Sequence, residues 1–186
     1  MTHLEKVNAP DFFTKMEAAF KQQFDADQRR AVVLLAHESQ MNNVTDLNQF
    51  SYILATCYHE CRFKSIPEIR AKRGTKVWQM QEKYWYTGYY GRGFSQLTWR
   101  ANYEKFEKRT ALPLVANPDL VLKPEVGAEI LVDGMVNGLF SGVKLSRYIQ
   151  PGKPPDFLRA RRVVNGNFQA DKVRNAALIF VRLLSE

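Results

Sequence analysis

Apolar residues recur at helical spacing in the first part of the chain. The segments FFTKMEAAF, residues 12–20, and DADQRRAVVLLAHESQ, residues 25–40, both show this spacing. In the second segment Asp25 and Gln28 are spaced as in a capping box, which typically begins a helix. Val32, Leu35 and Ser39 then fall on one face of that helix. We therefore predict one helix in each segment.

A third helix is predicted from Asp46 to about Cys61. Asp46 and Gln49 repeat the capping-box spacing at its start. On a helical wheel with 3.6 residues per turn, one stripe is apolar. Its members are Phe50, Leu54, Cys57 and Cys61, with Ile53 at the edge. We expect this stripe to face the core and both cysteines to be buried, free thiols.

The helical pattern fails between Ile66 and Phe94, where Pro67 and four glycines interrupt the chain. We expect loops and a small two- or three-stranded sheet there. Helical patterns resume in residues 97–109, 117–136, 157–166 and 171–184. The predicted fold is one mainly α domain over residues 1–186, with a small β-rich lobe.

Aromatic side chains crowd into residues 78–103. They are Trp78, Tyr84, Trp85, Tyr86, Tyr89, Tyr90, Phe94, Trp99 and Tyr103. Aromatic rings can pack on the apolar faces of sugars, and their polar groups can bond sugar hydroxyls. Gln96, Thr98 and Asn102 add amide and hydroxyl groups. We expect at least half of the rings to fill the core instead.

Glu60 lies at the edge of the buried stripe of the third predicted helix. A half-desolvated carboxyl group there can hold its proton near neutral pH, as a general acid must. The alternative is a solvated Glu60, or one paired with Arg62 or Lys64. Glu68 follows just beyond the helix, and glycoside hydrolysis commonly uses two such carboxyl groups.

A formal net charge of +8 indicates an anionic partner. Nucleic acid, a membrane surface and an acidic polymer such as bacterial cell wall all qualify. The aromatic residues lie beside Gly, Gln and Thr without a clear Lys/Arg stripe, so nucleic-acid binding is disfavoured. Cys57, His59 and Cys61 cannot converge from one helix, which argues against a zinc site. We expect no metal and no organic cofactor.

Five motifs occur in a fixed order along the chain. They are YHE (58–60), GRGFSQLTWRANY (91–103), NPDL (117–120), GLFSGVKL (138–145) and RRVVNG (161–166). Together they resemble glycoside hydrolase family 19, in its phage endolysin branch, from about Tyr52 to the C-terminus. One departure is that Cys61, Arg62 and Phe63 follow Glu60, where the family often has small residues.

The resemblance implies a two-lobed, lysozyme-like α+β fold and an inverting mechanism. It matches Glu60 to the general acid and Glu68 to the general base, with Glu82 as the alternative base. It matches Thr98 to a residue that holds the attacking water. The substrate-binding candidates are His59, Tyr90, Gln96, Trp99, Asn102, Arg161 and Asn165.

The function that we expect is hydrolysis of the β-1,4 bond between N-acetylmuramic acid and N-acetylglucosamine in peptidoglycan. The basic charge and the absence of the disulfides of plant members favour it over chitinase activity. Two further hypotheses are lytic transglycosylase chemistry and a basic nucleic-acid-binding module. The expected partner is the peptidoglycan glycan strand, bound by a monomer.

The N-terminal residues show no apolar run of signal-peptide length. We therefore expect synthesis in the cytoplasm and release to the cell wall by a separate factor such as a holin. The last helix, VRNAALIFVRLL, is largely apolar with basic residues near its ends. Either it packs on the core, which we favour, or it acts on an anionic outer-membrane surface.

Overall fold

The computed structural model of the chain describes residues 2–186 and is mainly helical. The α-helices are α1 (Phe12–Phe20), α2 (Ala26–Met41), α3 (Leu47–Cys61), α4 (Lys76–Gln81), α5 (Arg100–Thr110), α6 (Pro124–Asn137), α7 (Phe157–Ala160) and α8 (Ala170–Ser185). The short 3-10 helices are η1 (Glu5–Asn8), η2 (Trp85–Thr87), η3 (Pro118–Leu122), η4 (Leu145–Arg147) and η5 (Arg161–Val163). Among residues 2–186, none of these helices combines the length and apolarity that a bilayer crossing requires.

The predicted helix starts are confirmed at α2 and α3. The Asp25 side chain accepts a hydrogen bond from the backbone N–H of Gln28, and the Gln28 side chain accepts one from the backbone N–H of Asp25, which completes the capping box. Asp46 accepts from the backbone N–H of Gln49 at the start of α3. Each cap satisfies an N–H group that has no partner inside its helix.

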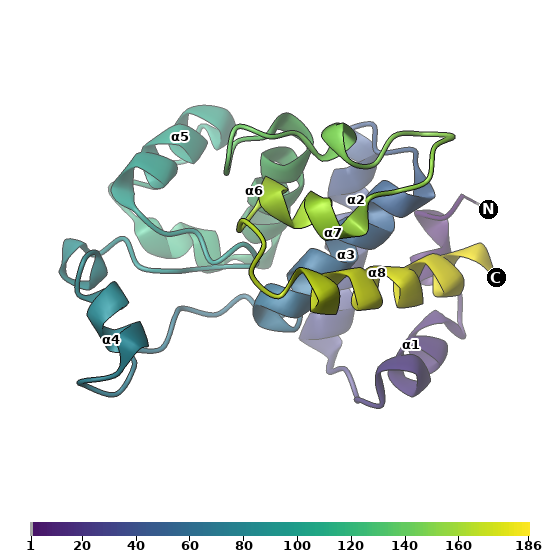
Figure 1. Cartoon of the computed structure of the whole chain (residues 1–186), viewed down its shortest axis with the longest axis horizontal. Coiled ribbons are helices and arrows are strands. Elements are labelled where there is room, and N and C mark those ends of the chain that lie inside the picture. The colour runs from purple at the N-terminus through teal and green to yellow at the C-terminus, as the bar shows by residue number, and fades with distance from the viewer. Residues whose placement is uncertain (1) are drawn as a thin grey trace.

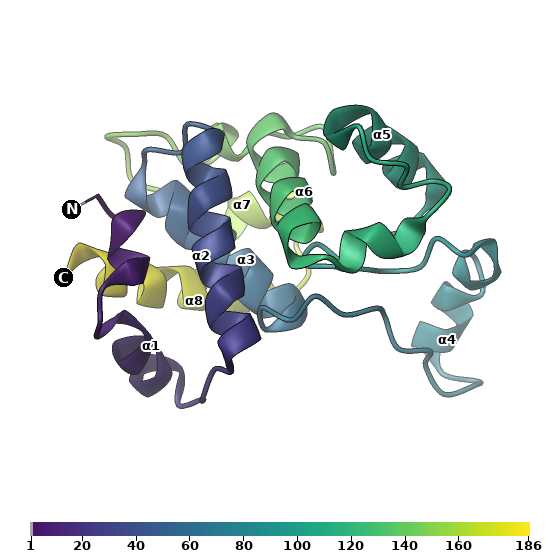
Figure 2. The same ribbon diagram turned by 180° about the vertical axis from the view of Figure 1, so that it is seen from behind.

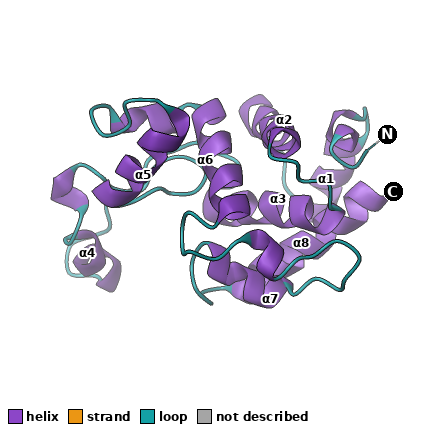
Figure 3. Ribbon diagram, turned by 90° about the horizontal axis from the view of Figure 1, so that it is seen from above, coloured by secondary structure: helices purple, strands orange, loops and turns teal. Residues whose placement is uncertain are grey.

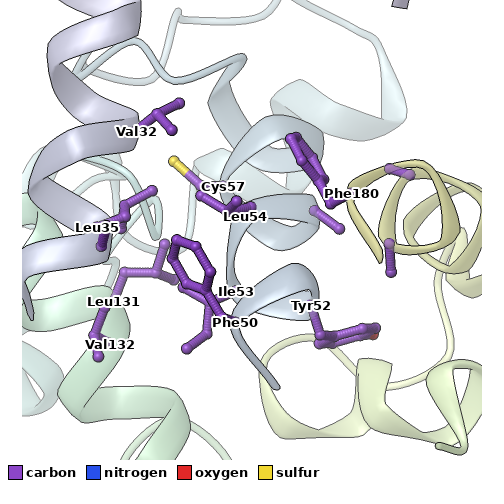
Figure 4. Close-up of a cluster of buried hydrophobic side chains, with 14 of the residues drawn as sticks. Val32, Leu35, Phe50, Tyr52, Ile53, Leu54, Cys57, Leu131, Val132 and Phe180 are labelled. Atoms are coloured by element: carbon purple, nitrogen blue, oxygen red, sulfur yellow. The ribbon is translucent and has the colours of Figure 1, made fainter. Parts of the chain in front are cut away.

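Helix α3 is the centre of the main hydrophobic cluster, which we call the core cluster. It packs against α8 on one side, while α2 packs against α6. Figure 4 shows Phe50, Leu54 and Cys57 of α3 among side chains from α2, α6 and α8. Full burial of each large apolar side chain contributes about 1.5–3 kcal/mol, so this stripe fixes how α3 lies.

The predicted apolar stripe of α3 is therefore confirmed. Both cysteines are buried and unoxidised, with their sulfur atoms 3.8 Å apart. Helix α8 also packs on the core: Val173, Ala177 and Phe180 are fully buried.

A second cluster, the α5 cluster, lies between α5, η3 and α6. Its buried members are Leu97, Tyr103, Phe106, Leu114, Val121, Val126 and Ile130. Helix α6 contributes to both clusters, since Leu131 and Val132 belong to the core cluster. Phe140, just after α6, packs against both clusters. The chain thus has two apolar centres that are joined along α6.

The prediction of a small β-rich lobe is wrong. Between Ile66 and Phe94 there is one isolated β-bridge, which joins Pro67 and Arg92. Figure 3 shows helices and loops without a strand. Thr75 caps α4 by accepting from the backbone N–H of Trp78. The backbone of this region is satisfied by helical turns and side chains rather than by a ladder of paired strands.

We call residues 64–88 the α4 lobe. Figures 1 and 2 show α4 at the end of the molecule opposite both termini, tethered by extended loops. None of residues 64–88 belongs to either hydrophobic cluster, and within this range Gln81 is the one buried residue. The expectation that at least half of the aromatic residues in 78–103 fill the core is also wrong, because only Phe94 and Tyr103 of the nine are buried.

Candidate active site

A cavity of about 350 Å³ opens where the end of α3, the α4 lobe and the start of α5 meet. Its wall contains Glu60, Glu68, Gly91, Ser95, Gln96, Leu97, Thr98, Trp99, Asn102, Phe140, Val164 and Asn165. Seven of the ten residues that the sequence nominated for the site lie in this wall: Glu60, Glu68, Gln96, Thr98, Trp99, Asn102 and Asn165. Two carboxyl groups, one from a helix and one from a loop, thus face a common space.

Glu60 lies in the last turn of α3, and its side chain is only 15% exposed. Its Oε1 atom lies 2.6 Å from Nη1 of Arg161, whose side chain is 1% exposed. The two atoms are close without the alignment of a hydrogen bond. The partner of Glu60 is thus neither of the neighbouring cations Arg62 and Lys64, but a residue from the far end of the chain.

Arg161 contacts Glu60 from outside the cavity wall. Its Nε donates to the backbone carbonyl of Phe168, 3.0 Å away, which fixes the guanidinium. Buried charges require partners because removing them from water costs several kcal/mol each. The resemblance nominated Arg161 for substrate contact, but the residue is positioned to hold the carboxyl group of Glu60.

Glu68 is held by three hydrogen-bond donors. Its Oε1 accepts from Nε2 of Gln81 at 2.9 Å and from the hydroxyl of Tyr84 at 2.8 Å. Its Oε2 accepts from the backbone N–H of Gly91 at 3.1 Å. Such donors stabilise the ionised carboxylate and fix its direction. Burial and the neighbouring Glu68 raise the pKa of Tyr84, so its hydroxyl keeps its proton as a donor.

Gly91 brings the chain close to Glu68. A Cβ atom added to Gly91 would lie 3.0 Å from Oε1 of Gln96 and 3.3 Å from Oε2 of Glu68. The backbone N–H of Glu68 also donates to the carbonyl of Gly91 at 2.7 Å, next to the Pro67–Arg92 bridge. A side chain at residue 91 would therefore displace the groups that line this wall of the cavity.

Glu82, the alternative base, lies outside the cavity wall. Its carboxyl group pairs with Arg70. The guanidinium of Arg70 lies 5.5 Å, 4.9 Å and 5.5 Å from the ring centres of Trp78, Trp85 and Tyr86. Glu82 thus belongs to a polar and aromatic cluster inside the α4 lobe, which leaves Glu68 as the second carboxyl group of the cavity.

Three other polar residues of the cavity wall are anchored to the backbone. Thr98 donates its hydroxyl hydrogen to the carbonyl of Gln96, and Asn102 donates to the carbonyl of Thr98. Gln96 donates to the carbonyls of Ile66 and Gly93. Both residues line the cavity, and the hydroxyl oxygen of Thr98 and the amide oxygen of Asn102 remain available as acceptors.

Backbone strain borders the cavity. Arg62 and Phe63, directly after Cys61, have φ values of 55° and 61°, and Gln96 and Trp99 have values of 50° and 75°. Left-handed conformations are uncommon for residues other than glycine, and they cluster at functional sites. The turn after α3 is held because Phe63 is buried and the carbonyl of Arg62 accepts from Gln28 at 2.7 Å. Residues with a Cβ atom thus occupy positions that glycine alone adopts without strain.

Two other nominated residues, His59 and Tyr90, lie away from the cavity wall. His59 is half-buried on α3, and burial lowers its pKa. The ring of Tyr90 stacks on Trp85, with centroids 4.6 Å apart, and lies under the guanidinium of Arg92. Both residues therefore support neighbouring structure rather than face the cavity.

Sequence reasoning missed several residues of the site. Gln81 and Tyr84 hold Glu68, and the spacing of Glu68, Gln81 and Tyr84 gives no periodic signal. Ser95 lines the cavity with a buried hydroxyl oxygen that has no hydrogen-bond partner within residues 2–186. Phe140 adds an apolar wall, and it lies in a motif that carries the resemblance only by its order along the chain.

No family model matches the chain, and no curated protein matches it either.

Proposed function

We propose that the protein hydrolyses the β-1,4 bond between N-acetylmuramic acid and N-acetylglucosamine in peptidoglycan, with inversion at the anomeric carbon. The observation that carries the proposal is the pair of carboxyl groups, Glu60 and Glu68, in the wall of one cavity. An inverting glycosidase needs one carboxyl group to protonate the leaving oxygen and a second one to activate water.

Glu60 is the general acid in this mechanism. Its Oε1 faces Arg161, so Oε2 is the atom that carries the proton to the glycosidic oxygen. In the ion pair with Arg161 the carboxyl group of Glu60 carries no proton. Glu60 must therefore bind a proton before the glycosidic bond breaks. Arg161 then stabilises the carboxylate that remains once the proton has left.

Glu68 is the general base. Three donors fix its carboxyl group in the cavity wall, and the acceptor oxygen of Thr98 helps to hold the water. The base takes a proton from this water as its oxygen attacks the anomeric carbon. Room for the water requires carboxyl groups about 6.5–9.5 Å apart.

The sugar-binding surface is formed by aromatic and amide groups. Trp99 is 46% exposed in the cavity wall, where its ring can cover the apolar face of a sugar. Asn102, Asn165 and the unpartnered Ser95 hydroxyl supply bonds to hydroxyl and acetamido groups. The net charge of +8 favours acidic peptidoglycan over neutral chitin.

The resemblance to glycoside hydrolase family 19, in its endolysin branch, supports the same reaction. It rests on the ordered motifs from YHE at 58–60 to RRVVNG at 161–166. A two-lobed, lysozyme-like arrangement, a monomer and release to the cell wall for bacteriolysis are parts of this proposal. The α4 lobe and the α5 cluster would form one lobe, and the core cluster the other.

Mass spectrometry of purified peptidoglycan after digestion tests the proposal. We expect soluble fragments with a reducing N-acetylmuramic acid end, and NMR of the first products should show the α-anomer. Products with a 1,6-anhydro end would establish a lytic transglycosylase instead. Release of sugars from chitin but not from peptidoglycan would establish a chitinase, and no cleavage of either polymer would overturn the proposal.

A further inference from the structure

Exposed apolar side chains are concentrated in the α4 lobe. Ile69 is 82% exposed, Val77 56%, Met80 62% and Tyr86 79%. Neither hydrophobic cluster includes any residue of this lobe. These side chains therefore do not stabilise the fold by burial, and their exposure to water needs another reason.

The interior of the α4 lobe is polar and aromatic. Gln81, 1% exposed, donates to Glu68 and to the carbonyl of Ile69, and accepts from the backbone N–H of Ala71. Arg70 pairs with Glu82 among three aromatic rings. Because these contacts hold the lobe together, its aliphatic side chains remain on the outside.

The exposed face of α4 combines apolar and basic groups. Lys76 and Met80 are one turn apart on α4 and share a face, with Val77 at its edge. Lys83 is exposed in the turn just after the helix. Lys72 and Arg73 precede α4 in an exposed run. Long basic side chains can lay their carbon stems beside apolar groups while their charges reach an anionic surface.

The cations on and beside α4 are unpaired among the residues that the structure describes. Lys72, Arg73, Lys76 and Lys83 form no ion pair within residues 2–186. The two acidic side chains of the lobe are both engaged, Glu68 by three donors and Glu82 by Arg70. The unpaired charge of the lobe is therefore positive, and it lies in the same short segment as the exposed apolar side chains.

We propose that the α4 lobe docks on an anionic lipid surface. Met80, Val77 and Ile69 enter the boundary between headgroups and acyl chains, and Lys72, Arg73, Lys76 and Lys83 bind the lipid phosphates. Interfacial segments have this combination of aliphatic and basic side chains. An acidic polymer in water would need the charges alone and would leave the aliphatic groups without a role.

The position of α4 fits this partner. It lies at the end of the long axis, away from both termini, where a flat surface can reach it (Figures 1 and 2). Helix α8, the other segment with an apolar face, buries Val173, Ala177 and Phe180 in the core cluster. The apolar face of α8 is thus occupied, and that of the α4 lobe is free.

Co-sedimentation of the full chain with vesicles tests the proposal. Vesicles of phosphatidylcholine with phosphatidylglycerol should bind the protein, and vesicles of phosphatidylcholine alone should not. Each cation near an anionic bilayer strengthens binding by about fivefold, so Lys76→Glu/Lys83→Glu should lower the partition coefficient by about 25-fold or more. Val77→Ser/Met80→Ser should also lower binding, because it removes the inserted groups while all charges remain.

Matched controls change the same chemistry elsewhere. Lys108→Glu/Lys153→Glu reverses two exposed cations outside the lobe, and Leu178→Ser removes a side chain that is 52% exposed on α8. Both controls and Glu60→Gln should bind vesicles as the unchanged protein does, and circular dichroism checks that every variant is folded.

Three results would overturn the proposal. They are no binding to anionic vesicles, full binding by both lobe variants, and loss of binding in the charge variant alone. The third result would mean that the lobe binds any polyanion through its charges, without inserting apolar groups. In that case a DNA column should retain Val77→Ser/Met80→Ser as strongly as it retains the unchanged protein.

Discussion

At the scale of single residues, the site depends on how each carboxyl group is held. Glu60 has one buried cationic partner, Arg161, whereas Glu68 has three neutral donors. Glu60, beside a fixed cation, and Glu68, held by neutral donors, should therefore respond differently when their partners are replaced. Two predictions separate these roles.

The first prediction concerns the pair of Glu60 and Arg161. Glu60→Gln should abolish nearly all lysis but keep the fold, because its amide oxygen still faces the guanidinium of Arg161. Glu60→Leu should be less stable than the unchanged protein by about 3–5 kcal/mol, because it leaves a buried guanidinium without a partner. Urea unfolding of the two variants measures this difference, and lysis by Glu60→Gln at the unchanged rate would exclude Glu60 as the acid.

The second prediction concerns Tyr84. Tyr84→Phe removes one donor to Glu68, and a hydrogen bond to a charged group is worth about 1.5–3 kcal/mol, so kcat should fall about tenfold or more. Tyr86→Phe, on a ring 79% exposed in the same lobe, is the control and should leave kcat unchanged. An unchanged kcat in Tyr84→Phe would remove Tyr84 from the site.

At the scale of elements, local signals in the sequence predicted the helices but not the α4 lobe. The capping residues Asp25 and Asp46 lie three residues from their partners, so a short window contains the whole interaction. The lobe depends on Gln81 bonding to residues 68–71, which a short window does not reveal. Glycines and aromatic residues favour a sheet with tight turns, but these side-chain bonds satisfy the backbone without one.

The candidate site likewise has features that local sequence predicts and features that it does not. The cavity residues Gln96, Thr98 and Asn102 come from one contiguous motif, and their convergence was predicted. The contact of Glu60 with Arg161 joins distant parts of the chain, and the αL turn at Arg62 and Phe63 comes from tertiary packing. Neither feature follows from the local pattern of residues.

The third prediction concerns the α4 lobe as an element. Gln81→Leu should leave the carbonyl of Ile69 and the N–H of Ala71 without partners, so residues 68–88 should open locally. Hydrogen exchange should quicken in this segment while α3 and α8 keep their protection, because the lobe belongs to neither hydrophobic cluster. Gln79→Leu, on the exposed side of α4, is the matched control. Uniformly faster exchange throughout the protein would show that the lobe is not an independent unit.

At the scale of the whole molecule, the cavity lies where the two hydrophobic clusters meet. Phe140 packs against both clusters and also lines the cavity. Its ring lies against α6 at Gly134, where an added Cβ atom would come within 2.2 Å of the ring. Glycine at this position therefore sets how closely the ring, and with it the cavity wall, approaches α6.

The fourth prediction tests this joint. Gly134→Ala should push the ring of Phe140 away from α6, with a loss of about 1–3 kcal/mol in stability from overpacking and a larger loss in lysis. Gly127→Ala is the control on the same helix, where the new Cβ atom would lie 3.3 Å from the ring of Phe94. Like Gly134→Ala, this variant gains about 1 kcal/mol of helix propensity, but its new Cβ atom makes a milder contact. The stability and the lytic activity of Gly127→Ala should therefore change little. Thermal unfolding and turbidity assays compare the two variants. If they behave alike, the position of Phe140 does not control the cavity, and the two clusters are coupled through α6 alone.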